Sequence, residues 1–217
     1  MSGSRFSTNL LGLALALVFV LCPALYRGNV NGQSPVDGID ARANTTQLAK
    51  GLSSPDPLLR QRSAEALAKL AATDQRKLVE GYQLQEKNKE VRLALDWALY
   101  RMGHSDALYR VVRDLDSGRQ NQAVGYLSEL ESPDLLYSFL KKESNAARTT
   151  AGLLRALAVI GNADTLEVIK PYLESVQPYV AEAAETAHDE IEKRLGETSP
   201  SGRARQRTVE KPADKPE

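Results

Sequence analysis

The chain has 217 residues, of which 28 are basic and 28 acidic, so its formal net charge at pH 7 is zero. Nucleic-acid-binding proteins usually have a basic excess, and this balance argues against a nucleic-acid partner. Aromatic residues make up only 6% of the chain, whereas alanine and leucine, which are favourable in helices, are plentiful. This composition is typical of an all-α protein.

Residues 1–32 have the features of a signal peptide. An apolar run from Leu10 to Leu25 follows Arg5, and it is shorter than the roughly 20 residues that span a membrane. We expect cleavage before Gln33, which would make the protein exported, either periplasmic or secreted. An uncleaved membrane anchor is an alternative, and a lipoprotein modified at Cys22 is another.

Two segments without a clear apolar pattern flank the central part of the chain. Residues 33–44 are expected to form a flexible linker. Residues 197–217 are rich in proline, serine and charge, and such a segment cannot bury enough apolar surface to offset the entropy of ordering. We therefore expect a disordered tail. Cys22 is the only cysteine, so a cleaved chain would have no disulfide and no cysteine metal site.

The central part of the chain contains a repeat. Four stretches, residues 60–74, 92–106, 120–134 and 150–164, each end in an aspartate, and these aspartates are 32, 28 and 30 residues apart. Large apolar residues stand four and seven positions before each aspartate, on one face of an α-helix. We therefore expect helix–turn–helix units that stack as an α-solenoid over residues 45–196.

Turn and cap residues mark the expected helix boundaries. The aspartate at the end of each stretch is placed to cap the amphipathic run that follows it. Gly103 and Gly161 stand where the preceding helices should stop. Residues 47–52 predict a short first helix. Residues 177–197 predict a final helix with an acidic outer side, which suits the end of a repeat array.

Three segments that overlap the repeated stretches, "LLRQRSAEALAKL", "EVRLALDWALYRMG" and "AARTTAGLLRALAVIG", resemble HEAT-like repeats, in particular the short variety named after phycobilisome lyases. Leu59-Arg60 and Val91-Arg92 match the apolar-arginine pair that opens the second helix of such a unit, whereas the third unit has Gln120 instead of arginine. The resemblance implies a solenoid whose second helices line a concave face. It implies no particular activity, because these proteins mostly present surfaces to partners.

The only tryptophan of the chain, Trp97, lies outside the repeated apolar columns. Its equivalents in the other units are Glu65, Gly125 and Arg155, a mixture typical of an exposed position. The sequence therefore predicts that Trp97 points away from the core. The alternative is that Trp97 packs against the neighbouring repeat helices, in space left by Gly125.

The exposed interpretation places a binding site on the concave face. Leu93, Trp97 and Tyr100 share one stripe of a helix, and an exposed cluster of this composition beside arginines is typical of an interaction hot spot. The predicted partner-binding residues are Leu93, Trp97, Tyr100, Arg101, Arg60 and Arg155.

Charge is distributed unevenly along the repeat. Residues 45–113 contain 12 basic and 8 acidic residues, a net charge of +4, and residues 114–196 contain 8 basic and 14 acidic residues, a net charge of −6. Such a distribution is compatible with ordinary solubility. It would also suit electrostatic orientation of a partner, or head-to-tail self-association.

The sequence contains no recognisable catalytic pattern. The two histidines, His104 and His188, lie in different units, and we find no zinc-binding spacing, no glycine-rich phosphate loop and no hydrolase or metalloprotease motif. We therefore expect no enzyme activity, no metal and no cofactor. His104 is expected to favour the C-terminal end of its helix as a cation.

These observations predict a non-enzymatic exported scaffold or adaptor that binds a protein or peptide in a concave groove. Membrane contact is expected only through an uncleaved N-terminal segment. The resemblance leaves a chromophore-handling protein similar to the phycobilin lyases as an alternative, although export and a mature chain without cysteine argue against it. A structural subunit of an envelope complex is a further alternative.

Overall fold

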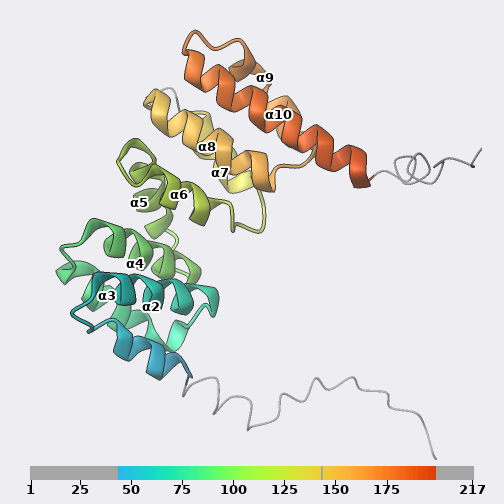
Figure 1. Ribbon diagram of the computed structural model, residues 1–217. Coiled ribbons are helices and arrows are strands. Elements are labelled where there is room, and N and C mark those ends of the chain that lie inside the picture. Colours follow the sequence, from blue (N-terminus) through green and yellow to red (C-terminus); the bar gives the residue numbers. More distant parts are fainter. Residues whose placement is uncertain (1–43, 143, 199–217) are drawn as a thin grey trace, which may run out of the picture. The chain divides into compact units, whose positions relative to one another are not determined.

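The computed structural model describes residues 44–142 and 144–198, and all regular structure in these ranges is helical (Figure 1). The all-α prediction is confirmed. The predicted signal peptide, the linker up to residue 43, and the tail from residue 199 onward lie outside the described residues. Within the described part of the chain, no helix is both long enough and apolar enough to cross a membrane.

The helices follow the predicted order, with long and short helices alternating along much of the chain. A first helix covers residues 44–51, three residues earlier than predicted. The elements after it are α2 (Pro57–Lys69), the 3-10 helix η1 (Thr73–Gln75), α3 (Arg76–Gln85), α4 (Lys89–Arg101), α5 (Ala107–Arg113), the 3-10 helix η2 (Asp114–Asp116), α6 (Gln120–Leu127), α7 (Asp134–Leu140), α8 (Ala147–Ile160), α9 (Ala163–Leu173) and α10 (Pro178–Thr198).

The helices pack as a solenoid. We call α2, α4, α6, α8 and α10 the repeat helices; each of them packs against the next one along the chain. The shorter helices pack beside them, α3 and α5 against α4, α7 against α8, and α9 against α10 (Figure 1). Because each repeat helix buries its apolar stripe mainly against neighbours in sequence, one continuous core forms along the stack.

The repeated leucine column forms the centre of that core. Leu67, Leu99, Leu127 and Leu157 are all 0 to 2% exposed, as the repeat predicts. Leu70, which belongs to the column four positions before the aspartate, is instead 50% exposed. Only the short helix of residues 44–51 precedes α2 in the described chain, so this end of the stack has less to cover it.

The recurring aspartates do not cap the helices that follow them, so this prediction is wrong. Asp106 occupies the N-cap of α5 without a side-chain hydrogen bond, and Asp134 and Asp164 lie inside the first turns of α7 and α9. The cap of α9 is Asn162, which exchanges two hydrogen bonds with Thr165 in a capping box. The carboxylates in the first turns still interact favourably with the helix dipole.

The predicted stop at Gly103 is confirmed. Gly103 has a φ of 91°, and the main-chain nitrogen of His104 donates to the oxygen of Leu99 at 2.9 Å, which is the hydrogen bond of a Schellman cap. Ala71 takes the equivalent position after α2 with a φ of 45°. A residue with a Cβ is strained in this left-handed conformation.

The last helix covers the end of α8. Arg194 of α10 donates to the main-chain oxygens of Ala158 and Gly161, at 3.0 and 2.8 Å, and so satisfies carbonyls that the end of α8 leaves free. Gly161 lies so close to α10 that a Cβ there would be 2.6 Å from Cδ1 of Ile191. The acidic side predicted for this helix is exposed, at Glu182, Glu185, Asp189 and Glu192.

Candidate functional site

Trp97 is buried, and the prediction that it points outward is wrong. Its residue exposure is 1%. The indole stacks on Tyr100 of its own helix, with 5.4 Å between ring centroids, and on Tyr126 of α6, with 5.6 Å between centroids. The alternative, packing against neighbouring repeat helices, is therefore confirmed. The space beside Gly125 nevertheless stays open, because a Cβ there would meet no atom within 4 Å.

The position of α4 explains why the column comparison failed for Trp97. Helix α4 packs against α2, α3, α5 and α6, and all residues from Leu93 to Leu99 are buried. The equivalent positions Glu65 and Arg155 are only half-buried, and Gly125 is exposed. A comparison between units assumes that the same face of every repeat helix is exposed to solvent. In α4 that face is covered by neighbouring helices.

The other members of the predicted stripe are also largely covered. Leu93 is fully buried, so it cannot contact a partner. Tyr100 and Arg101 are half-buried, and burial raises the pKa of the Tyr100 phenol above its usual value. The guanidinium of Arg101 lies 5.7 Å from the centroid of the Trp97 ring and donates to the main-chain oxygen of Glu129 at 3.4 Å. Arg101 therefore shields the tryptophan.

Arg60 and Arg155, predicted at the rim of the same patch, have structural partners elsewhere. Arg60 forms two hydrogen bonds to the Glu86 carboxylate, at 2.8 and 2.9 Å, and donates to main-chain oxygens before α2. Arg155 donates to Gln120 at 3.0 Å and lies over the Tyr179 ring at 5.8 Å. Neither arginine is among the residues that line the cavity beside Trp97.

A cavity of about 740 Å³ opens over Trp97 on the repeat helices, and we call it the Trp97 cavity. Three successive repeat helices, α2, α4 and α6, contribute to it. Trp97, although only 1% exposed, is part of its lining, and most of the other lining side chains are polar. The lining residues are Glu65, Ala66, Lys69, Trp97, Gln122, Gly125, Tyr126 and Glu129.

A chain of hydrogen bonds fixes the polar side of the Trp97 cavity. The Tyr126 hydroxyl donates to Oε1 of Glu65 at 2.6 Å and accepts from Gln122 at 2.8 Å. The same Glu65 oxygen accepts from Gln61 at 2.8 Å. Burial and the hydrogen bond to Glu65 raise the pKa of the Tyr126 phenol well above its usual value. The hydroxyl therefore stays a donor at physiological pH and holds Glu65 in place.

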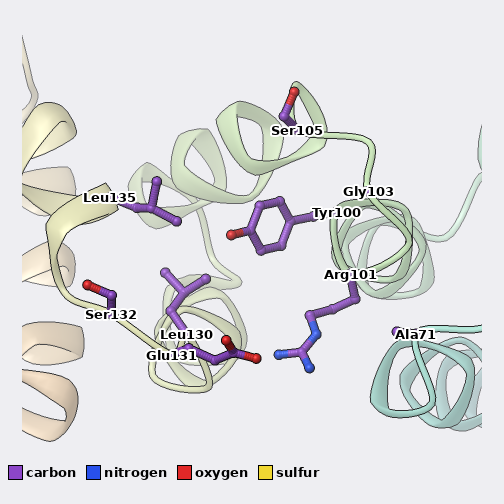
Figure 2. A pocket seen from close by; sticks show the side chains of 9 residues that line it. All are labelled: Ala71, Tyr100, Arg101, Gly103, Ser105, Leu130, Glu131, Ser132 and Leu135. Atoms are coloured by element: carbon purple, nitrogen blue, oxygen red, sulfur yellow. The ribbon is translucent and has the colours of Figure 1, made fainter.

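A second cavity, of about 540 Å³, lies at the C-terminal ends of the same helices (Figure 2). Figure 2 shows the Tyr100 ring reaching into this cavity toward Leu130 and Leu135, while Arg101 extends toward Glu131. Two of the predicted site residues, Tyr100 and Arg101, therefore do line a concave surface. Trp97 is not among the residues that line this second cavity.

A third cavity, of about 550 Å³, contains a buried carboxylate that the sequence analysis did not single out. Asp96 has a side-chain exposure of 5%, and its Oδ1 accepts from Nε of Arg110 at 2.5 Å and from Gln83 at 3.0 Å. Burial raises the pKa of Asp96, although Arg110 acts in the opposite direction. One signal was present in the sequence, because Asp96 is a lone charge inside the apolar run "LALDWAL".

The histidines contact carboxylates near the surface. His104 Nδ1 lies 3.5 Å from Glu80, just past the end of α4, and His188 Nδ1 lies 3.7 Å from Glu192. In the described residues, no group of three or more histidine, cysteine, aspartate or glutamate side chains could hold a metal ion.

Comparison with known proteins does not identify a family. No family model matches the chain, and no curated protein matches it. Among solved structures, the crystal structure of an engineered protein from the Northeast Structural Genomics Consortium is similar over 73% of this chain and 83% of its own length, with 20% sequence identity and a TM-score of 0.35. A similarity at this TM-score supports no argument about fold or function.

Proposed function

We propose that the protein is a non-enzymatic repeat scaffold of the HEAT-like kind, and that it holds a segment of a protein or peptide partner against its repeat helices. The Trp97 cavity is the observation that most supports this proposal. It is about 740 Å³ in volume and is formed by three successive units, so a ligand there would contact several units at once. Stacked repeats commonly use such extended surfaces for binding.

The charge at the Trp97 cavity favours a basic side chain of the partner. Within the described residues, neither Oε2 of Glu65 nor the carboxylate of Glu129 makes a hydrogen bond or ion pair, and Lys69 is the one basic residue of the lining. A lysine or arginine placed between these carboxylates would form charge-assisted hydrogen bonds. The adjacent Tyr126 and Gln122 would add neutral hydrogen-bonding groups.

Blocking the cavity without disturbing the core tests this proposal. Gly125 is exposed and a Cβ there meets no atom within 4 Å, so Gly125→Leu fills the opening while the fold is retained. Gly81→Leu is the matched control, because Gly81 also lies within a helix, α3, with no atom within 4 Å of its Cβ. Peptides are selected from a random display library on the full chain and then measured against all three proteins.

We expect the selected peptides to be rich in lysine and arginine and to bind the wild type and Gly81→Leu equally. Gly125→Leu should weaken binding at least about tenfold, which corresponds to about 1.4 kcal/mol. Because Trp97 is the only tryptophan, its fluorescence should change on binding. Equal binding to Gly125→Leu, or an unchanged Trp97 emission, would show that this cavity is not the site.

Export remains a prediction from the N-terminal sequence, and it supports a role outside the cytosol. A cleavage site before Gln33 would be read directly from the N-terminal sequence of the protein purified from its native source. A mature chain that begins with residue 1 or 2 would overturn the signal-peptide prediction.

A further inference from the structure

The third cavity, which we call the Arg110 cavity, gathers an unusual number of arginines. Arg92 of α4 and Arg110 and Arg113 of α5 all line it. His104, Glu80 and Asp96 are the other titratable residues of its lining, which also includes the apolar side chain of Leu84, 77% exposed. Three guanidinium groups therefore share one concave surface with two carboxylates.

The two carboxylates differ in their surroundings. Asp96 is buried and accepts hydrogen bonds from Arg110 and Gln83. Glu80 lies 3.5 Å from Nδ1 of His104. Within the described residues, the side chains of Arg92 and Arg113 form no hydrogen bond, ion pair or ring contact. Asp96 and Glu80 thus offset part of the positive charge of the cavity, and among its three arginines only Arg110 is directly paired with a carboxylate.

The contact between Asp96 and Arg110 has a geometric consequence as well as an electrostatic one. The Asp96 carboxylate accepts from Nε of Arg110, and within the described residues the two terminal nitrogens of this guanidinium have no hydrogen-bond partner. The outer donors of the guanidinium are therefore fixed in place and remain free for a ligand. A preorganised guanidinium loses less entropy when it binds an oxyanion than a freely rotating one.

The dipole of α5 accounts for the positions of two of the three arginines. Arg110 and Arg113 lie in the last turn of α5, where cations interact favourably with the helix dipole. Arg92, in contrast, lies near the start of α4, where the dipole disfavours a cation. A dipole effect alone does not bring Arg92 to the same cavity.

From these observations we propose that the Arg110 cavity is a binding site for an oxyanion, a carboxylate or phosphate group of a ligand, held by the guanidinium groups of Arg92, Arg110 and Arg113. Guanidinium groups match the geometry of both oxyanions and can bind them through two parallel hydrogen bonds. Asp96 is a positioning residue that orients Arg110. Leu84 offers an apolar contact to the part of the ligand next to the charged group.

This site is separate from the proposed peptide site. The two cavities use different residues of α4, Trp97 in one case and Arg92, Asp96 and Leu99 in the other. The oxyanion proposal therefore does not depend on the proposed function, and Gly125→Leu should leave oxyanion binding unchanged.

Titration of the full chain with inorganic phosphate and with succinate, at constant ionic strength set by chloride, tests the proposal. Binding is measured by isothermal titration calorimetry and by the rise in melting temperature, which follows mass action for a ligand of the folded state. The variant is Arg92→Ala/Arg113→Ala, since both side chains are exposed and unpartnered. Arg62→Ala/Arg76→Ala is the matched control, because these arginines are equally exposed and lie outside the cavity.

We expect saturable binding of at least one of the two oxyanions to the wild type and to the control pair. The cavity variant should bind about tenfold more weakly for each guanidinium removed, as expected for hydrogen bonds between charged groups. A preference for phosphate would indicate a phosphorylated ligand, and a preference for succinate would indicate a carboxylate ligand. Equal binding by the variant and the control, or no saturable binding of either oxyanion by the wild type, would overturn the proposal.

Discussion

The rings of Trp97 and Tyr126 are parallel, with 5.6 Å between their centroids and 2° between their planes. This contact joins α4 to α6, two successive repeat helices that make few other contacts with each other. The hydroxyl of the same tyrosine reaches back to Glu65 of α2. Tyr126 therefore connects three units through one side chain, by stacking at its ring and by hydrogen bonding at its tip.

Tyr126→Ala should lower the free energy of unfolding by about 3 to 5 kcal/mol, the range for truncating a buried aromatic ring. It should also expose Trp97, so that acrylamide quenches its fluorescence and its emission shifts to longer wavelength. Tyr109→Ala is the control, because Tyr109 is an aromatic residue that is 57% exposed. Denaturant unfolding gives the energies. A loss no larger than that of Tyr109→Ala would contradict the role of the stack.

Ala71→Gly should raise the free energy of unfolding by about 0.5 to 1 kcal/mol. Ala71 has a φ of 45°, and glycine adopts this conformation without the strain that a Cβ causes. The reverse change at the equivalent position, Gly103→Ala, should destabilise by a similar amount, because Gly103 has a φ of 91°. Urea unfolding gives the free energy of unfolding of both variants. If both substitutions changed it in the same direction, the left-handed conformation at these two positions would not explain the effect.

Gly161→Ala should destabilise the protein, whereas Gly125→Ala should not. A Cβ at Gly161 would lie 2.5 Å from the oxygen of Leu157 and 2.6 Å from Cδ1 of Ile191, so α10 would have to move. At Gly125, within α6, nothing lies within 4 Å, and replacing a helical glycine by alanine gains about 0.5 to 1 kcal/mol. The melting temperatures of the two variants and the wild type, measured by thermal unfolding, test this difference. A tolerated Gly161→Ala would mean that α8 and α10 pack less tightly than described.

Stability should fall in acid partly through Glu86. Its side chain is 8% exposed, and the hydrogen bonds from Arg60 hold the pKa of its carboxyl below the usual value. A carboxyl with a lowered pKa in the folded state stabilises the fold above its unfolded pKa, about 4.3, and this contribution disappears as pH falls through the folded-state pKa.

Glu86→Gln should therefore lose about 1.5 to 3 kcal/mol at neutral pH, as expected for hydrogen bonds to a charged group. The difference from the wild type should stay constant above about pH 5 and shrink in more acidic solution. Denaturant unfolding between neutral pH and pH 3 measures it, with the exposed Glu90→Gln as reference. A difference that grows on acidification would have the wrong sign for this ion pair.

The repeat was predictable because its signal is distributed over several copies. The leucines at 67, 99, 127 and 157 each occupy the same buried place, so agreement among four copies indicated the stack. The caps were less predictable. An aspartate recurs at the end of each repeated stretch, yet Asn162 and Thr165, not Asp164, form the cap of α9. Which of several nearby polar side chains caps a helix depends on where the turn ends, to within one or two residues.

The candidate site was predicted only in part. Trp97, Tyr100 and Arg101 do lie together, since they share one helix, but Trp97 is buried because α4 is covered by four other helices. The contacts of Arg60 with Glu86, and of Asp96 with Arg110, join residues 26 and 14 positions apart. No periodic pattern indicates such pairs, because they depend on how particular turns bring two elements together.

The contact of Arg194 with the end of α8 has a consequence for engineering the chain. In many repeat arrays one unit can be added or removed because all units present the same surface to their neighbours. Here a side chain of α10 donates to two main-chain oxygens at the end of α8, those of Ala158 and Gly161, and the backbone of Gly161 fits against Ile191 of α10. A unit inserted between α8 and α10 would separate these groups, so this junction should not accept an additional unit.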